Sequence, residues 1–212
     1  MEKVEKIQKA YKEYVLENGK DPASVFSFMK KLKMNEAEFF EFYPSFSAVD
    51  QAIWESFVTD TIRTLEGQEL YITYTVREKL LAFYYTWIEL LRANRSYVLC
   101  SYQRIKQPVF RTLGPLTALK RAFYQFGTEL LLEGRETGEV VPRPILSDKY
   151  IDGMWMQCLY VLDFWIKDAS KGFEQTDTAI EKVVNTGFDF MGKSVVDSFF
   201  DLAKFVYQTR KP

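Results

Sequence analysis

Histidine is absent from this chain of 212 residues. Without it a protein has no Ser-His-Asp or Cys-His catalytic machinery, no histidine-ligated zinc and no imidazole pH switch. Glu-x-x-His pairs for a di-iron centre are excluded for the same reason. Isolated carboxylates remain, but a lone acid is not a mechanism. We therefore expect no catalytic residues, no metal and no cofactor, and a protein that is not an enzyme.

Cysteine and long apolar runs are also scarce. The two cysteines, Cys100 and Cys158, are far apart and form no Cys-x-x-Cys pair, which excludes a structural zinc or a thioredoxin-type site. Two lone thiols fit a reducing compartment. The longest apolar run, residues 80–91, is shorter than the roughly 20 residues of a membrane-spanning helix, and the N-terminal segment lacks an apolar signal core. The expected location is cytoplasmic, with no integral membrane segment.

Glycine and proline are few, at 10 and 7 residues, whereas 17% of the residues are aromatic. The glycines at 114, 134 and 138 do not have the spacing of a phosphate-binding loop. The net charge is −1, from 28 basic and 29 acidic residues, so the chain lacks the basic excess of a protein that coats nucleic acid. Scarce turn residues argue against an all-β fold and for helices.

Apolar residues recur every three or four positions along most of the chain, which is typical of amphipathic helices. The pattern predicts helices over residues 2–18, 24–32, 36–42, 47–66, 74–92, 97–104, 107–134, 147–167 and 175–209. Ser24 and Asn35 are expected to cap the second and third, with Glu38 completing a capping box. The sequence predicts an all-α protein with a three-helix head, residues 1–46, and a larger helical body, residues 47–212.

The head carries a set of ordered motifs. Asn18-Gly19 ends the first helix, Ser24-Val25 opens the second, residues 30–35 form the corner, and Tyr43-Pro44-Ser45 follows an aromatic third helix. In order and spacing these residues resemble the helix-turn-helix head of the TetR family of transcriptional regulators. The resemblance implies double-stranded operator DNA as a partner. The candidate DNA-binding residues are Ser24, Lys30, Lys31, Lys33, Asn35, Glu36, Glu38 and Tyr43.

The recognition helix departs from the family pattern. Residues 35–46 contain three glutamates and no basic residue, and carboxylates oppose the phosphate contacts that supply much of DNA affinity. Glutamate can still accept a hydrogen bond from cytosine N4 in the major groove. The lysines at 30, 31 and 33 fit either phosphate contacts or a solvated helix end. Phe39, Phe40 and Tyr43 are expected in the core of the head, and Phe42 and Phe46 either pack on the fourth helix or face a partner.

The body concentrates the aromatic residues, and pockets between helices are often lined by such side chains with a few polar anchors. One hypothesis is a site for a hydrophobic small molecule; the other is a plain core. The candidate ligand-binding residues are Tyr84, Trp87, Tyr124, Gln125, Trp155, Gln157 and Tyr160.

The last predicted helix is apolar on more than one face and must be covered on two sides. The family resemblance implies a homodimer, in which this helix and the one over residues 147–167 form a two-fold four-helix interface. The candidate interface residues are Phe188, Val195, Val196, Phe199, Phe200, Leu202 and Val206.

Two functions fit these features. The first is a TetR-like regulator that binds operator DNA as a dimer, in which a hydrophobic ligand changes the separation of the two heads. The alternative is a TetR-fold protein without DNA binding that carries a lipid or docks a protein partner. Residues 165–182 resemble lipid-binding accessory proteins of ubiquinone biosynthesis, which share the fold. The fold resemblance favours the regulator, and the acidic recognition helix favours the alternative.

Overall fold

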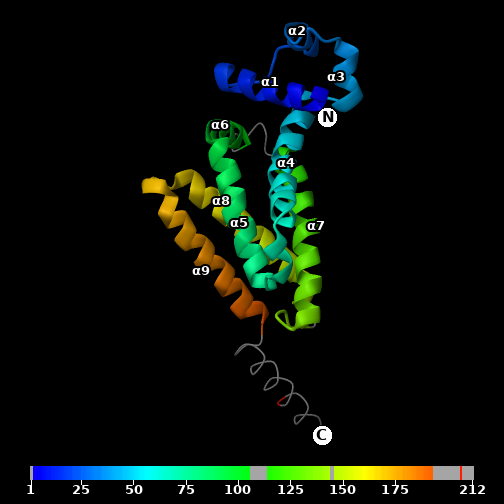
Figure 1. The fold of residues 1–212 in the computed structure, drawn as a ribbon. Helices are drawn as coiled ribbons and strands as arrows, with labels where there is room; N and C mark the ends of the chain where they lie inside the picture. Colours follow the sequence, from blue (N-terminus) through cyan, green and yellow to red (C-terminus); the bar gives the residue numbers. More distant parts are fainter. Residues whose placement is uncertain (1, 106–113, 144–145, 193–205, 207–212) are drawn as a thin grey trace. The chain divides into compact units, whose positions relative to one another are not determined.

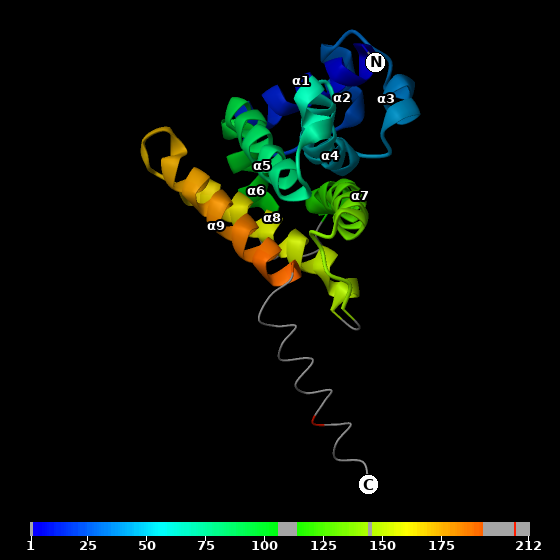
Figure 2. The same ribbon diagram turned by 60° about the horizontal axis from the view of Figure 1, so that its bottom comes forward.

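A computed structural model describes residues 2–105, 114–143, 146–192 and 206. The predicted all-α class is confirmed: the described residues form α-helices joined by turns and short 3-10 segments, with no strand among them. Figures 1 and 2 show the helices, which are α1 Glu2–Asn18, α2 Val25–Lys31, α3 Glu36–Phe42, α4 Phe46–Glu66, α5 Val76–Ala93, α6 Arg95–Ile105, α7 Gly114–Thr137, α8 Tyr150–Lys167 and α9 Glu174–Met191.

Helix starts follow the capping residues. Ser24 accepts a hydrogen bond from the Ser27 N–H at 3.2 Å, as predicted for the start of α2. The Asn35 N–H donates to the Glu38 carboxylate at 2.8 Å, which confirms the capping box of α3. The fourth helix begins earlier than predicted, because the Ser45 hydroxyl accepts from the Ala48 N–H at 3.3 Å.

The helix predicted over residues 175–209 is interrupted at Gly192. Helix α9 ends at Met191, Gly192 has an extended ψ of −176°, and Val206 is again helical, whereas residues 193–205 and 207–209 lie outside the described part of the chain. The Met191 carbonyl accepts from the Val141 N–H at 2.8 Å, and the Arg143 guanidinium donates to the Gly192 carbonyl at 2.6 Å. A loop some fifty residues away therefore binds the carbonyl groups at the end of α9.

The chain divides into two compact units. One comprises residues 1–64 and 87–123 and the other residues 65–86 and 124–212. The first unit contains the whole head together with most of α4 and all of the described part of α6. In Figure 1, α2 lies on one side of α1 and α6 on the other.

An aromatic cluster forms the core of the head. The Phe46 ring stacks on Tyr11 at 5.8 Å between centroids and meets the edges of Phe28 and Phe39 at 5.3 and 5.2 Å. Phe46, at the start of α4, thereby joins α1, α2 and α3. Neither expected placement of Phe46 is observed, because Phe46 is itself the first residue of the fourth helix and packs into the core of the head.

In the second unit, α8 and α9 lie side by side, as both ribbon views show. Val161, Leu162 and Trp165 of α8 are fully buried, and so are Ile180 and Val184 of α9. Gly127 brings α7 close to α8, because a Cβ at this position would lie 2.7 Å from Cδ1 of Ile151.

Candidate functional site

The head presents a helix-turn-helix. Helix α2 ends at Lys31, and Lys33 in the turn adopts a left-handed conformation with φ of 57°. The Met34 N–H donates back to the Met29 carbonyl at 3.0 Å, which closes the turn before Asn35 starts α3. Local hydrogen bonds therefore set the corner between the two helices, and the head's aromatic core holds their inner faces.

The outer face of α3 is acidic and aromatic. Glu36 and Glu41 are exposed, and Phe40 and Phe42 keep 53% and 41% of their surface in solvent. The expectation that Phe40 belongs to the core is wrong: a helix of two turns can bury only one side, and Phe39 occupies it. Phe42 is also exposed, and whether a partner covers it stays a prediction.

Glu38 is held in place by two partners. Its carboxylate accepts from the Lys3 ammonium at 2.6 Å and from the Asn35 N–H. The Lys3 hydrogen bond, followed by that of Asn35, lowers the pKa of Glu38. Glu38 therefore anchors α3 to α1, whereas the carboxylates of Glu36 and Glu41 form no hydrogen bond with any residue that the structure describes.

The other candidate DNA-binding residues differ in exposure. Lys30, Lys31 and Lys33 are exposed at the corner and form no ion pair within the part of the chain that the structure describes. Ser24 and Asn35 are exposed at the starts of α2 and α3. Tyr43 is 7% exposed, and its hydroxyl accepts from the Gln8 side chain at 2.8 Å. The three lysines and two helix starts thus share the accessible surface, whereas Tyr43 belongs to the interior.

The large aromatic candidates for ligand binding are buried. Tyr84 and Trp87 have no exposed surface, and Trp155 keeps 7%. Trp87 belongs to the first unit, whereas Tyr84 and Trp155 belong to the second. These side chains are core residues of their units.

The remaining ligand-binding candidates are more polar. Tyr124 donates to Asp152 at 2.8 Å, and Gln125 is exposed on α7. Gln157 donates to the Val183 carbonyl at 3.3 Å, while its buried Oε1 has no hydrogen-bond partner among the described residues. Tyr160 is 49% exposed. These four side chains contact different groups and do not line one common pocket.

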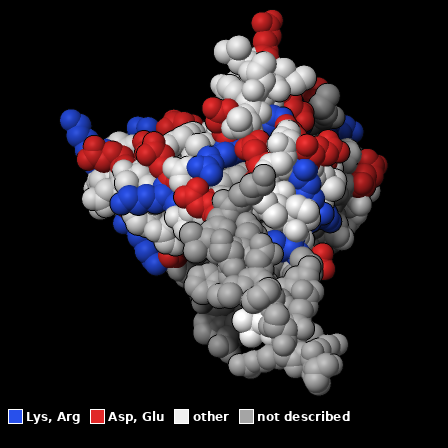
Figure 3. All heavy atoms as spheres, turned by 90° about the horizontal axis from the view of Figure 1, so that it is seen from below, with Lys and Arg blue, Asp and Glu red and all other residues white. Residues whose placement is uncertain are grey.

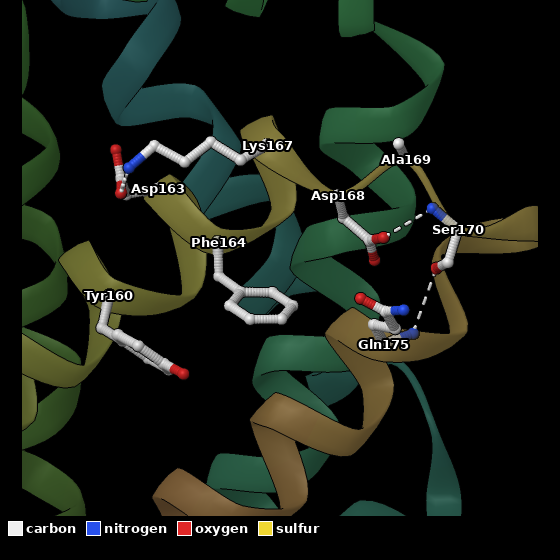
Figure 4. Close-up of a pocket in the computed structure, with 8 residues that line it drawn as sticks. All are labelled: Tyr160, Asp163, Phe164, Lys167, Asp168, Ala169, Ser170 and Gln175. Carbon is white, nitrogen blue, oxygen red and sulfur yellow. Dashed lines mark hydrogen bonds and ion pairs between the residues drawn. The ribbon is translucent and has the colours of Figure 1, made fainter.

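A hollow of about 670 Å³ opens at the corner where α8 turns into α9. Figure 4 shows Tyr160 and Phe164 on its apolar side and Asp168, Ser170 and Gln175 on its polar side. An ion pair between Lys167 and Asp163 lies at the rim. Tyr160 alone, among the predicted ligand-binding residues, lines this hollow.

Asp168 fixes the turn beside the hollow. Its carboxylate accepts from the Ser170 N–H at 2.8 Å and from the Thr176 hydroxyl at 2.7 Å and N–H at 3.0 Å. Burial alone raises the pKa of Asp168, but these hydrogen bonds outweigh it and bring the pKa to about 2. The residue therefore stays charged and holds the start of α9.

Most of the candidate dimer-interface residues cannot be placed. Val195, Val196, Phe199, Phe200 and Leu202 lie outside the described residues. Phe188 is 3% exposed, and the Arg77 guanidinium lies over its ring at 5.5 Å. Val206 is 38% exposed. Phe188 thus packs within the second unit.

Met156 and Phe190, exposed apolar side chains on α8 and α9, were missed at the sequence level, and Tyr160 was named only as a ligand-binding candidate. Met156, Tyr160 and Phe190 keep 64%, 49% and 45% of their surface in solvent. The spacing of four between Met156 and Tyr160 places them on one face of α8, and this was the available signal. Both helices of the expected four-helix interface therefore carry exposed apolar groups.

The family model described as the tetracyclin repressor-like, C-terminal domain matches residues 79–206, more than half of the chain. The chain belongs to the TetR family. No match was found among curated proteins or among solved structures. The family match lies outside residues 1–46, so for the TetR head the evidence is the helix-turn-helix geometry itself.

TetR proteins are transcription regulators and generally not enzymes. Within the described ranges of this TetR chain, no group of His, Cys, Asp or Glu side chains is arranged to hold a metal ion. No described helix combines the length and hydropathy that a membrane crossing requires. On the face drawn in Figure 3, basic side chains lie among acidic ones, in line with the near-zero net charge.

Proposed function

We propose that this TetR-family protein is a cytoplasmic transcriptional regulator that binds operator DNA as a homodimer and responds to a hydrophobic small molecule. The observation that carries the proposal is the exposed helix-turn-helix, at whose corner Lys30, Lys31 and Lys33 form no ion pair with any described residue. Lys30 and Lys31 lie over the rings of Phe26 and Tyr14, at 5.9 and 5.4 Å, and keep their charge available to solvent. Lysines without a carboxylate partner are available to phosphates, and phosphate contacts position a recognition helix in the groove.

The electrostatics of the head are less unfavourable than the sequence suggests. Three glutamates occur in α3, but the Glu38 charge is already bound by Lys3 at 2.6 Å. Two exposed glutamates and three exposed lysines remain around α3 and the corner. Glu36 and Glu41 can accept from cytosine N4, so α3 is suited to selective contact with bases once the lysines bind the backbone.

Dimerisation is supported by the exposed apolar groups of α8 and α9. Met156, Tyr160 and Phe190 would be covered in an isologous pair, the commonest arrangement of soluble oligomers. Two heads in one dimer would read half-sites about one helical turn apart, roughly 34 Å. A ligand that favours another separation of the heads would then release the DNA.

The small-molecule response is supported by the hollow beside Tyr160 and Phe164, whose volume of about 670 Å³ suits a small organic molecule. Aromatic side chains on one side and polar groups on the other can orient an amphiphilic ligand. The buried aromatic candidates Tyr84 and Trp155 fit a solid core and add no lining to this hollow.

DNA binding is tested by fluorescence anisotropy with DNA from upstream of the protein's own gene, a pool of genomic fragments and scrambled DNA. The expected result is selective binding that weakens with salt. The salt slope is the change in the logarithm of DNA affinity with the logarithm of salt concentration. Lys31→Gln should lower its magnitude by about two for a dimer, because each head loses one phosphate contact. Lys171→Gln removes an exposed lysine elsewhere and should leave the slope unchanged.

The alternative function is favoured by one observation. Phe26, Phe40 and Phe42 keep 59%, 53% and 41% of their surface exposed on the head, and aromatic groups are common in protein interfaces. A head that docks a partner protein would bind no DNA from the genomic pool even at low salt. That result would replace the regulator by the partner-docking function.

A further inference from the structure

A second hollow lies within the first unit, between α1 and the junction of α5 and α6. Its volume is about 380 Å³, and α1 contributes Lys9, Lys12, Glu13 and Leu16 while the junction contributes residues 92–97. Four lining side chains are basic (Lys9, Lys12, Arg92 and Arg95) and one is acidic. The whole chain has a net charge of −1, so this positive excess is local.

Lys12 is the inner cation of this hollow. It is partly buried, and its ammonium donates to Oδ1 of Asn94 at 3.1 Å. Asn94 in turn donates to the Leu90 carbonyl at 3.0 Å, which fixes the amide. An ammonium has three donors, so two remain for a ligand.

The charge of Lys12 is not neutralised by contact. No carboxylate lies within ion-pair distance of Lys9 or Lys12 among the residues that the structure describes. Burial lowers the pKa of Lys12; the more distant Asp60 and Glu13 raise it, and Lys9 lowers it further. A partly buried cation beside a second cation is stabilised by an anion.

We propose that the hollow between α1 and α6 binds a small anion that carries a phosphate or carboxylate group. The two lysines of α1 supply the point charges that carry the proposal. The guanidinium groups of Arg92, which also pairs with Glu89 at 3.4 Å, and of Arg95 lie at the edge of the hollow and add positive potential. A volume of about 380 Å³ accommodates a metabolite rather than a single ion. The bound anion ties the first helix of the head to α6.

The site is separate from the helix-turn-helix. In Figure 1, α2 lies on the opposite side of α1 from α6, so the hollow does not belong to the surface formed by α2 and α3. Binding of a small anion here requires neither DNA nor the ligand hollow beside Phe164. Anion binding in this hollow is therefore independent of the proposed function.

The test is isothermal titration and thermal unfolding of the full chain with two probes, pyrophosphate and citrate, against sodium chloride at matched ionic strength. We expect at least one probe to bind and to raise the melting temperature. Lys12→Gln keeps a hydrogen-bonding group near Asn94 and should weaken binding about tenfold or more. Arg95→Gln is the second variant, and Lys20→Gln is the control, since Lys20 is exposed outside the hollow.

Pyrophosphate binding alone would assign a phosphate ligand, and citrate binding alone a carboxylate. The proposal is overturned if neither probe exceeds sodium chloride, or if Lys12→Gln and Arg95→Gln bind as tightly as Lys20→Gln. It is also overturned if the anions do not bind but Lys12→Gln weakens DNA binding, because the hollow would then be a phosphate contact for DNA.

Discussion

Replacing Asp50 by alanine is expected to destabilise the first unit strongly. Asp50, on α4, is 4% exposed and accepts from the Tyr97 hydroxyl and from the Ser101 hydroxyl at 3.1 Å, both on α6. The Ser101 oxygen also accepts from the Trp54 indole at 2.9 Å. Alanine at position 50 leaves two buried hydroxyl groups without their acceptor.

The expected loss of stability follows from the two hydroxyl groups, of Tyr97 and Ser101, that lose their acceptor. A buried donor without a partner costs about 1–3 kcal/mol, so two such donors cost roughly 2–6 kcal/mol. Removing the carboxylate also removes its own desolvation cost, which offsets part of this loss. We expect a net loss of about 3 kcal/mol in the free energy of unfolding, or roughly 6–12 °C in melting temperature for a chain of this size.

Urea unfolding followed by tryptophan fluorescence measures this loss. Asp60→Ala is the matched control on the same helix, because the ion pair of Asp60 with Arg63 at 2.8 Å is exposed to solvent, and it should change stability by less than about 0.5 kcal/mol. An Asp50→Ala protein within about 1 kcal/mol of the wild type would refute the reasoning, since the hydroxyl groups would then have found other acceptors.

Asp50→Asn tests the charge of Asp50 alone, because asparagine has nearly the same shape as aspartate but cannot ionise. Burial raises the pKa of Asp50 above 3.8, and the hydrogen bonds from Tyr97 and Ser101 and the charge of Arg104 only partly oppose this. The folded state therefore holds the Asp50 proton more tightly than the unfolded state does. The stability of the wild type relative to Asp50→Asn should fall as the pH rises above about 4. A flat difference between pH 3 and pH 7 would contradict a raised pKa.

The remaining predictions concern three other places. For Asp168 the pH dependence of stability runs the other way, because its pKa is lowered to about 2. The stabilisation by Asp168 is therefore present above about pH 4 and is lost as the pH falls toward 2. Asp168→Asn should abolish this part of the acid transition in melting temperatures measured across a pH series. Gly127→Val should cost about 2 kcal/mol in urea unfolding, because its Cβ would lie 2.7 Å from Cδ1 of Ile151, and an unchanged stability would show that the Ile151 side chain can turn aside. Replacing Glu36 and Glu41 together by glutamine should strengthen binding to scrambled DNA by about tenfold in anisotropy titrations and reduce the preference for operator DNA. Equal gains in affinity for operator and scrambled DNA would exclude base contacts by these two glutamates.

The helices could be predicted from the sequence because their positions depend on local signals. Periodic apolar residues give α1 and α8, and the side chains of Ser24 and Glu38 mark helix starts through hydrogen bonds over three residues. The end of α9 depends instead on Val141 and Arg143, which bind its last carbonyl groups from about fifty residues away. No local pattern contains that information, so the predicted helix runs through Gly192 without a break.

The candidate sites were harder to predict for a related reason. In a helix as short as α3, three phenylalanines fit several rotations, and only the packing of Phe39 against Phe46 at 5.2 Å shows that Phe40 faces solvent. Aromatic content likewise did not separate core residues such as Tyr84 from the side chains that line a hollow, such as Phe164. Both distinctions depend on neighbours that are distant in the sequence.

The shape of the head and its surface charge depend on different residues. Phe39 and Phe46 hold α3 against the other helices from its inner side, whereas Glu36 and Glu41 lie on its outer side. The outer side can therefore change its charge without loss of the fold, because its carboxylates contribute nothing to the aromatic core. A helix-turn-helix shape is for this reason necessary but not sufficient for DNA binding, and the salt slope, which counts phosphate contacts directly, is the quantity that decides between a DNA reader and a docking module.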